Sequence, residues 1–308
     1  MNVTELRKEL SRRKKLRVLL PVVLTVFVGA YAKHRYDVSK FELTGRLQSK
    51  HTAEISGITA SGISKDIFYI HNDSGDTSRF FAITPTGELK STINFTWSKG
   101  VVHDCEDIAT GPGPVKGKNY IYLGDIGDNG GTRSQISVYR ILELPTFATT
   151  PETHTQATTL HLTYPDGPKD AEAMMVDPVD KLLYIVSKRH DSVSVYSTPL
   201  SFKTHDSVVL HKKATLFFPG LKPFKWITAG SISKDGQKIL LKSYEKVYYW
   251  HRKPGEAIWQ ALKRKPLEPA YQAERQGEAI GFTLDGSSYY TTSEGVFSPI
   301  YKYKTPLN

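Results

Sequence analysis

The stretch "DAEAMMVDPVDKLLYIVSKRHDSVSVYST", residues 170–198, decides the fold, because it contains three short apolar segments separated by turns. Four other segments repeat this order of strands, and they begin at Glu54, Asp104, Thr228 and Gln276. The five starts are separated by 50, 66, 58 and 48 residues. A fixed order of short strands at such a period predicts the blades of a β-propeller, and it fits a parallel solenoid less well because solenoid repeats are shorter and more regular.

Each expected blade has a polar-to-apolar first strand, an apolar second strand, an aromatic-rich third strand and a variable fourth strand. The fourth strands of the first four units are expected at residues 89–96, 157–164, 213–219 and 257–263. The fifth unit lacks one, and "KFELTGRL", residues 40–47, is expected to supply it and so to cover a sheet edge. We therefore predict an all-β, five-bladed propeller of four-stranded antiparallel blades over residues 40–308. Six blades are the alternative, since the interval from Asp104 to Asp170 could hold a degenerate unit.

The first 39 residues have a different composition. Residues 1–17 carry seven basic and two acidic side chains and form a cytoplasmic n-region. Residues 18–32 are mostly apolar and end in Ala-Tyr-Ala, so they read as an N-terminal hydrophobic helix that is either a cleaved signal peptide or a signal anchor. Residues 33–39 are a linker. We expect a secreted or membrane-anchored protein, bound to the membrane through this segment, with the propeller on the extracytoplasmic side.

The net charge of +10 does not indicate a nucleic-acid partner. Half of the excess lies in residues 1–17, and the densest charged motifs of the remaining chain are acidic. Binding to phosphates requires clustered Lys and Arg, so we expect no nucleic acid. The single cysteine, Cys105, cannot form an internal disulfide, and the domain must be stable without one.

The motifs "YIHNDSGD", residues 69–76, and "YLGDIGDN", residues 122–129, place acidic residues where second strands end. In an antiparallel blade these ends lie beside the starts of the first strands, so all of them should meet at one mouth of the ring. Because residues i and i+2 of a strand share a face, the starts predict two tiers of side chains. The first tier is Glu54, Asp104, Asp170, Thr228 and Gln276, and the second is Ser56, Glu106, Glu172, Gly230 and Glu278.

Six carboxylates in two tiers repel one another unless cations neutralise them. Lys188, Arg189 and Lys242 could do so from within the chain. A bound hard cation is the other solution, and oxygen ligands favour Ca²⁺. The predicted metal ligands are Asp104, Glu106, Asp170, Glu172 and Glu278. His71 and His103 would instead favour a transition metal.

No serine or cysteine nucleophile motif and no zinc-protease motif occurs. The remaining chemistry is general acid/base catalysis or metal-assisted attack by water, with Glu106, Glu172 and Glu278 as candidate catalytic groups. The candidate substrate-binding residues are His71, Asp73, Asp125, Asn129, Lys188 and Arg189. Simpler roles compete with these assignments. Asp76 and Asp128 fit turns, while Glu54 and Asp107 could cap backbone N–H groups of a neighbouring blade.

The motifs "HNDSGD", "DCEDIA", "GDIGDN", "YPDGPKDAEAM" and "QGEAIGF…SEG" resemble a family of uncharacterised secreted or membrane-anchored bacterial β-propellers, over about residues 50–302. This resemblance implies the fold and no established activity. More distantly, the acid-first inner strands are similar to the esterase-like-activity-of-phytase propellers, which implies hydrolysis of a phosphate ester, although the hallmark spacing of propeller phytases is absent.

Two functions are therefore expected as alternatives. The first is a Ca²⁺-dependent hydrolase of a phosphate ester, nucleotide or glycan. The second is a non-catalytic propeller that holds a structural ion in its channel and binds a protein or glycan partner.

Overall fold

The computed structural model describes residues 41–97 and 102–307. The chain divides into two compact units, Met1–Glu42 and Leu43–Asn308, and the larger unit contains nearly all of the described structure. The expected n-region, hydrophobic helix and linker lie outside the described residues. Within the two described ranges, no helix combines the length and apolar character needed to cross a membrane.

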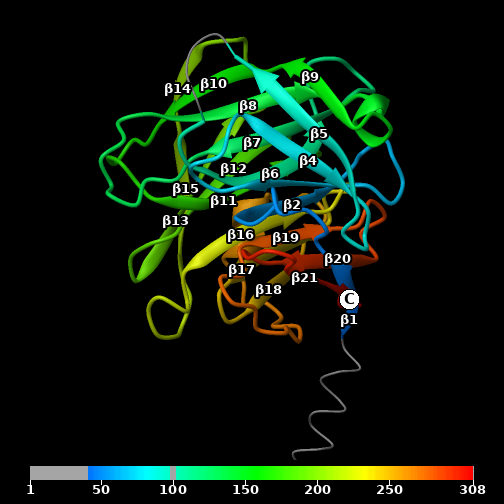
Figure 1. Ribbon diagram of the computed structural model, residues 1–308. Coiled ribbons are helices and arrows are strands. Elements are labelled where there is room, and N and C mark those ends of the chain that lie inside the picture. Colours follow the sequence, from blue (N-terminus) through cyan, green and yellow to red (C-terminus); the bar gives the residue numbers. More distant parts are fainter. Residues whose placement is uncertain (1–40, 98–101, 308) are drawn as a thin grey trace, which may run out of the picture. The chain divides into compact units, whose positions relative to one another are not determined.

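The described residues of the larger unit form five sheets, and each contains one inner strand at one of its edges. The inner strands are β2 (Ile55–Ala60), β6 (Cys105–Pro112), β11 (Ala171–Asp177), β16 (Ile227–Ile232) and β19 (Ala279–Phe282). Each of these strands contacts the next, and β19 contacts β2, so they close a ring at the middle of the unit (Figure 1). The five-bladed propeller is confirmed.

In each blade the second strand pairs antiparallel with the inner strand, and the third strand pairs antiparallel with the second. The second strands are β3 (Phe68–Asn72), β7 (Asn119–Asp125), β12 (Leu182–Ser187), β17 (Lys238–Ser243) and β20 (Ser288–Thr292). The third strands are β4 (Arg79–Ile83), β8 (Ile136–Leu142), β13 (Ser192–Pro199), β18 (Val247–His251) and β21 (Pro299–Lys304). Both faces of these strands are covered by neighbouring blades, which explains why almost every residue of β3, β7, β12 and β17 is buried.

Three of the four expected fourth strands form, as β5 (Leu89–Thr96), β10 (Thr158–Thr163) and β15 (His211–Phe217). The fifth blade is completed by β1 (Phe41–Arg46), which pairs with β21 as expected. The long second interval is occupied by η1 (Pro145–Ala148) and β9 (Glu152–Gln156), and β9 adds in parallel to β5 of the preceding blade. In the same way β14 (Asp206–Val209) adds to β10. The extra length therefore widens existing blades instead of forming a sixth.

The expected fourth strand of the fourth unit, residues 257–263, is wrong. This segment forms helix α2 (Ile258–Leu262), which buries Ile258, Ala261 and Leu262 against the core. Their spacing is helical, and the Gln260 side chain accepts a hydrogen bond from the Ala257 N–H at 2.8 Å to start the helix. The fourth-strand position keeps one isolated antiparallel bridge, between Tyr249 and Leu267.

Candidate functional site at the acidic mouth of the ring

A β-bulge lies near the start of each of the first four inner strands. The register shifts between Ile55 and Gly57, and at the equivalent points of β6, β11 and β16. The bulged residues are Ser56, Glu106, Glu172 and Thr228, and Glu278 precedes β19 at the same level. An extra residue in a bulge re-aims its side chain. The sequence prediction that Gly230 is equivalent to Glu106 and Glu172 is therefore wrong by two residues. Thr228 occupies the equivalent position in the fourth blade.

The ends of the second strands meet these starts, as expected from the blade topology. Ile55 pairs with Asn72, Cys105 with Asp125 and Ala171 with Ser187. The turns that follow these strand ends bring further polar residues to the same mouth of the ring. The repeated acidic motifs thus contribute to one shared site.

Within the described ranges, five carboxylates gather in two overlapping groups, and Asp73 belongs to both. One group contains Asp73, Asp104 and Glu106, and the other contains Asp73, Glu278 and Glu294. In each group, oxygens of the three side chains lie within 4.8 Å of one another. Oxygens that share one Ca²⁺ ion at about 2.3–2.6 Å can lie at most about 5 Å apart, so either group has the spacing of a cation site.

Burial and mutual repulsion keep several of these groups protonated at pH values where a carboxyl is normally charged. Burial first, and the Asp104 and Glu278 charges next, raise the pKa of Asp73 to about 7. Burial and the Glu278 charge raise the pKa of Glu294 to about 8. Burial and the Glu172 charge also raise the pKa of Glu106. A divalent cation would relieve this repulsion and displace the protons.

Lys188 supplies one internal positive charge. Its ammonium group pairs with Glu172 and lies 3.7 Å from Glu278 Oε1. Burial lowers the pKa of Lys188, but the charges of Glu172 and Glu278 outweigh this effect and raise it. Tyr244 donates a hydrogen bond of 2.5 Å to Glu278 Oε1 on the same side. The second oxygen of Glu172, Oε2, is buried and has no hydrogen-bond partner among the described residues.

Arg189 neutralises the next carboxylate along the rim. Its Nε pairs with Asp170 Oδ2, and its Nη2 donates to Asn129. The guanidinium lies 4.8 Å from the ring centroid of Trp226, and its side chain is 32% exposed. Asp170, Glu172 and Glu278, three of the predicted metal ligands, therefore have cationic partners. No ion pair to Asp73, Asp104, Glu106 or Glu294 is found among the described residues.

Two further predicted substrate-binding residues, Asp125 and His71, also have structural partners. The Asp125 carboxylate is buried and binds Arg133 at 2.8 Å, the Tyr139 hydroxyl and the backbone N–H groups of His103 and Asp104. His71 is also buried, and its Nδ1 lies 2.8 Å from the Asn72 carbonyl oxygen. Burial lowers the pKa of His71 to about 4, so the ring is neutral at pH 7.

Three aspartates have the simpler roles considered from the sequence. The Asp107 carboxylate accepts hydrogen bonds from the backbone N–H groups of Ile108, Met174 and Gly230, so it joins three blades at the ring interior. Asp76 accepts from the Thr77 N–H at 2.7 Å, and Asp128 accepts from the N–H groups of Thr132 and Arg133. These last two residues shape turns.

Sequence reasoning missed three contributors, Glu294, Tyr244 and Glu274. Glu294 lies in the "SEG" motif, whose place at a second-strand end was a usable signal. Glu274 precedes the fifth unit and has no counterpart in the other blades. Its buried carboxylate accepts from Tyr271 and Thr291 and lies 3.9 Å from the Lys242 ammonium. Burial lowers the pKa of Lys242 to about 8.

Comparisons with known proteins assign no family to the chain. No family model and no curated protein matches the chain. Among solved structures, a luciferin-regenerating enzyme is similar over 85% of this chain and 92% of that chain, with 11% sequence identity and a TM-score of 0.45. No activity follows from a similarity at this level. The family resemblance of the acidic motifs remains a prediction.

Proposed function

We propose that the acidic mouth binds a Ca²⁺ ion and that the protein is a metal-dependent hydrolase of an anionic substrate outside the cytoplasm, with a phosphate ester, nucleotide or glycan as the substrate class. The observation that carries this proposal is that Asp73 belongs to two clusters of three acidic side chains. In each cluster, oxygens of the three side chains lie within 4.8 Å of one another. Delivery outside the cytoplasm is part of the proposal and rests on the basic and apolar segments of residues 1–32.

The donor set supports a hard cation. Five carboxylates and no histidine make up the two groups among the described residues. Carboxylate oxygens suit Ca²⁺, whereas transition metals prefer ligand sets that include imidazole or thiolate. His71 is buried beside Gly57 and belongs to neither group. Asp73, Asp104 and Glu106 would hold the ion, or Asp73 with Glu278 and Glu294.

A bound ion would polarise a substrate oxygen and increase the acidity of a coordinated water. The chain supplies the other roles. Asp73 and Glu294 have pKa values raised to about 7 and about 8, which suit proton exchange near neutral pH. Arg189, held over Trp226 at the rim, would bind a negatively charged part of the substrate.

A non-catalytic binding module is the second candidate. The Lys188 and Arg189 ion pairs favour it, because they neutralise Glu172 and Asp170 without any bound ion. In this case the mouth would hold a structural ion or none, and its rim would bind a protein or glycan partner.

The first experiment is thermal unfolding with EDTA and with Ca²⁺, Mg²⁺, Mn²⁺ or Zn²⁺. An ion present at about 100 times its dissociation constant should stabilise the fold by about 2.7 kcal/mol. A selective shift with Ca²⁺ supports the cation site, and the absence of a shift with every ion would exclude it. Phosphate esters, nucleotides and glycosides should then be screened for hydrolysis in the presence of Ca²⁺.

Glu106→Gln is the informative variant for this screen. Glu106 belongs to a carboxylate group and has no ion-pair partner among the described residues, whereas Glu172→Gln would also break the ion pair with Lys188. Glu54→Gln is a matched control, because Glu54 is exposed at the same mouth and lies outside both groups. Hydrolysis that survives Glu106→Gln unchanged would contradict a catalytic cation site.

A further inference from the structure

A cavity of ≈ 330 Å³ lies at the other end of the ring, where the five inner strands finish. Thr59, Thr110, Val176, Ser231 and Phe282 line it, and each comes from a different inner strand. The acidic residues that form the mouth lie at the starts of the same strands. The cavity is therefore a second site, separated from the acidic mouth by the length of the inner strands, and its size falls within the range of small-molecule sites of about 300–1,000 Å³.

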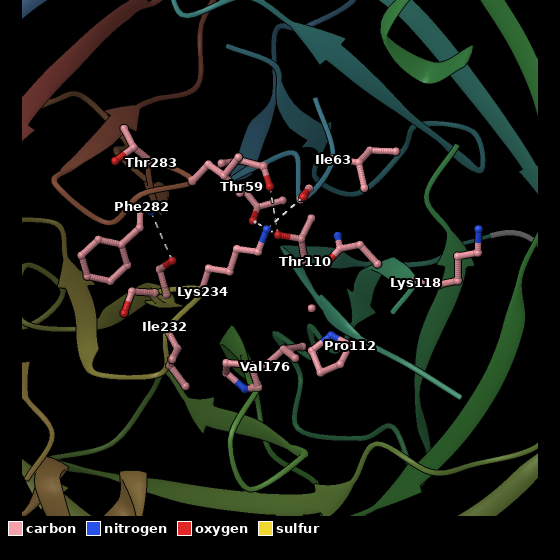
Figure 2. Close-up of a pocket in the computed structure, with 18 of the residues that line it drawn as sticks. Thr59, Ile63, Thr110, Pro112, Lys118, Val176, Ile232, Lys234, Phe282 and Thr283 are labelled. Carbon is pink, nitrogen blue, oxygen red and sulfur yellow. Dashed lines mark hydrogen bonds between the residues drawn. The ribbon is translucent and has the colours of Figure 1, made fainter. Parts of the chain in front are cut away.

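The walls combine apolar surface with hydroxyl groups and one well-placed cation. Ile63, Val176, Ile232 and Phe282 provide the apolar part. The described residues that line the cavity include lysines but no aspartate or glutamate. Figure 2 shows the Lys234 side chain extending toward the Thr59 and Thr110 side, with Lys118 at the margin and turned away. The electrostatic character is thus opposite to that of the acidic mouth.

After the hydrogen bonds within the cavity wall are counted, the Lys234 ammonium group still has N–H donors that can bind a ligand. Thr110 donates to the Ala60 carbonyl oxygen at 2.9 Å and therefore accepts from Thr59 at 3.3 Å, so both threonine protons are used within the wall. The Lys234 ammonium donates to the Gly62 carbonyl oxygen at 3.1 Å, which fixes the side chain across the opening without neutralising its charge. An ammonium group has three N–H donors, so others remain for a ligand.

We infer that this cavity binds a small monocarboxylate with an apolar body. The carboxylate would accept from Lys234, and the body would lie against Val176, Ile232 and Phe282. A single ammonium matches a single negative charge, which favours a monocarboxylate over a phosphate. This inference goes beyond the proposed hydrolase, since the carboxylates at the other mouth would repel such a ligand.

Benzoate is a suitable probe, tested on the full chain by thermal unfolding and titration calorimetry. Benzoate should raise the melting temperature. Acetate, which lacks the apolar body, and benzyl alcohol, which lacks the negative charge, should each raise it much less. Lys234→Met should weaken benzoate binding by about tenfold or more, because it removes a charge-assisted hydrogen bond. Its own melting temperature should stay close to that of the unmodified chain, since Lys234 is exposed. Lys116→Met is the matched control, because Lys116 is an exposed lysine of the neighbouring loop that does not line the cavity.

Four results would overturn the inference, and the fourth is a loss of benzoate affinity in EDTA. The first is the absence of a shift with benzoate, and the second is an equal shift with benzyl alcohol, which would mean apolar binding alone. The third is equal benzoate affinity in Lys234→Met and Lys116→Met. Benzoate affinity that is unchanged between EDTA and Ca²⁺ is expected, and a loss of affinity in EDTA would place the probe at the acidic mouth instead. The failure of this test leaves the proposed hydrolase untouched.

Discussion

Lys188, which follows β12, forms a buried ion pair with Glu172, the bulged residue of the adjacent strand β11. Both side chains are almost fully removed from water, with exposed fractions of 8% and 3%. Removing one partner of such a pair leaves the other charge without compensation. The intact ion pair therefore contributes little net stability, whereas breaking it destabilises the fold because one buried charge is left uncompensated.

Lys188→Met should lower the free energy of unfolding by about 3–5 kcal/mol, because Glu172 stays buried without a counter-charge. Urea denaturation followed by tryptophan fluorescence would measure this. The double variant Lys188→Met/Glu172→Gln should lose less than Lys188→Met alone. As a control, Lys246→Met breaks the exposed pair with Glu268 and should change the free energy of unfolding by no more than about 1 kcal/mol. Equal losses in the two single lysine variants would show that the buried pair has no special role.

The stability of the metal-free protein should fall as the pH rises from about 4 to about 8. In the folded protein, burial and nearby carboxylates raise the pKa of Asp73 to about 7 and that of Glu294 to about 8. In the unfolded chain both groups titrate near pH 4. The folded state therefore binds more protons over this interval, and the resulting stabilisation disappears as the pH passes through the folded-state pKa values.

Melting temperatures in EDTA across this pH range would measure the effect. The double variant Asp73→Asn/Glu294→Gln should show a flatter profile. If the profile of the double variant were as steep as that of the unmodified chain, other groups would be responsible. The stabilisation by Ca²⁺ should grow over the same range, because fewer protons then compete for the carboxylates.

Asp73→Asn should abolish the shift in melting temperature caused by Ca²⁺, because Asp73 belongs to both carboxylate groups. Glu294→Gln removes a ligand from one group only and should weaken the shift without abolishing it. Differential scanning fluorimetry with a Ca²⁺ titration separates the two outcomes. Asp66→Asn serves as the control, since Asp66 is exposed in a turn with a positive φ of 58° that asparagine tolerates. A full Ca²⁺ shift in Asp73→Asn would mean that the ion binds elsewhere.

Asp107→Asn should destabilise the fold by at least about 2 kcal/mol, because an amide NH₂ group cannot accept hydrogen bonds. The carboxylate accepts from Met174 at 2.9 Å, from Gly230 at 3.2 Å and from Ile108 at 2.8 Å. Either orientation of the asparagine leaves a buried backbone donor unpaired. Chemical denaturation measures the loss, and the Ca²⁺ response should persist. A stable variant that no longer responds to Ca²⁺ would reassign Asp107 to the cation site.

The periodic part of the structure could be predicted from the sequence. Each blade repeats one order of strands, so the starts of β2, β6 and β11 were visible as a pattern, and the missing strand of the fifth blade pointed to β1. The convergence of "HNDSGD" and "DIGDN" followed from antiparallel topology alone. These features depend on local pattern and connectivity, which a single sequence contains.

The pairing of charges could not be predicted in the same way. Bulges shift the register by one residue, and in the fourth blade no carboxylate marks Thr228 as the equivalent position. The partners Lys242 and Glu274 are 32 residues apart, and Glu274 lies outside the repeated strands. Such pairs decide which carboxylates have no cationic partner. In the structure, Asp73 and Glu294 therefore replace Asp170 and Glu172 as candidate metal ligands.

The closing strand β1 gives the last prediction. Its Thr44 Oγ1 atom lies 3.1 Å from the Ile300 carbonyl oxygen and 2.8 Å from the Pro85 carbonyl oxygen, so this residue links the fifth blade to the first. Gly45 follows directly, and a Cβ atom there would overlap the Thr86 carbonyl oxygen. Gly45→Val should therefore force the two blades apart and lower the free energy of unfolding by about 1–3 kcal/mol, as overpacking typically does.

Leu43→Val is the matched control for this variant, because Leu43 lies on the same strand with 52% of its surface exposed. It should change stability very little. Urea denaturation compares the two variants, and size-exclusion chromatography would show whether opening this junction exposes the edge of β21 to association. If Gly45→Val is as stable and as monodisperse as Leu43→Val, then β1 does not hold the ring closed, and the contacts among the five inner strands are sufficient to do so.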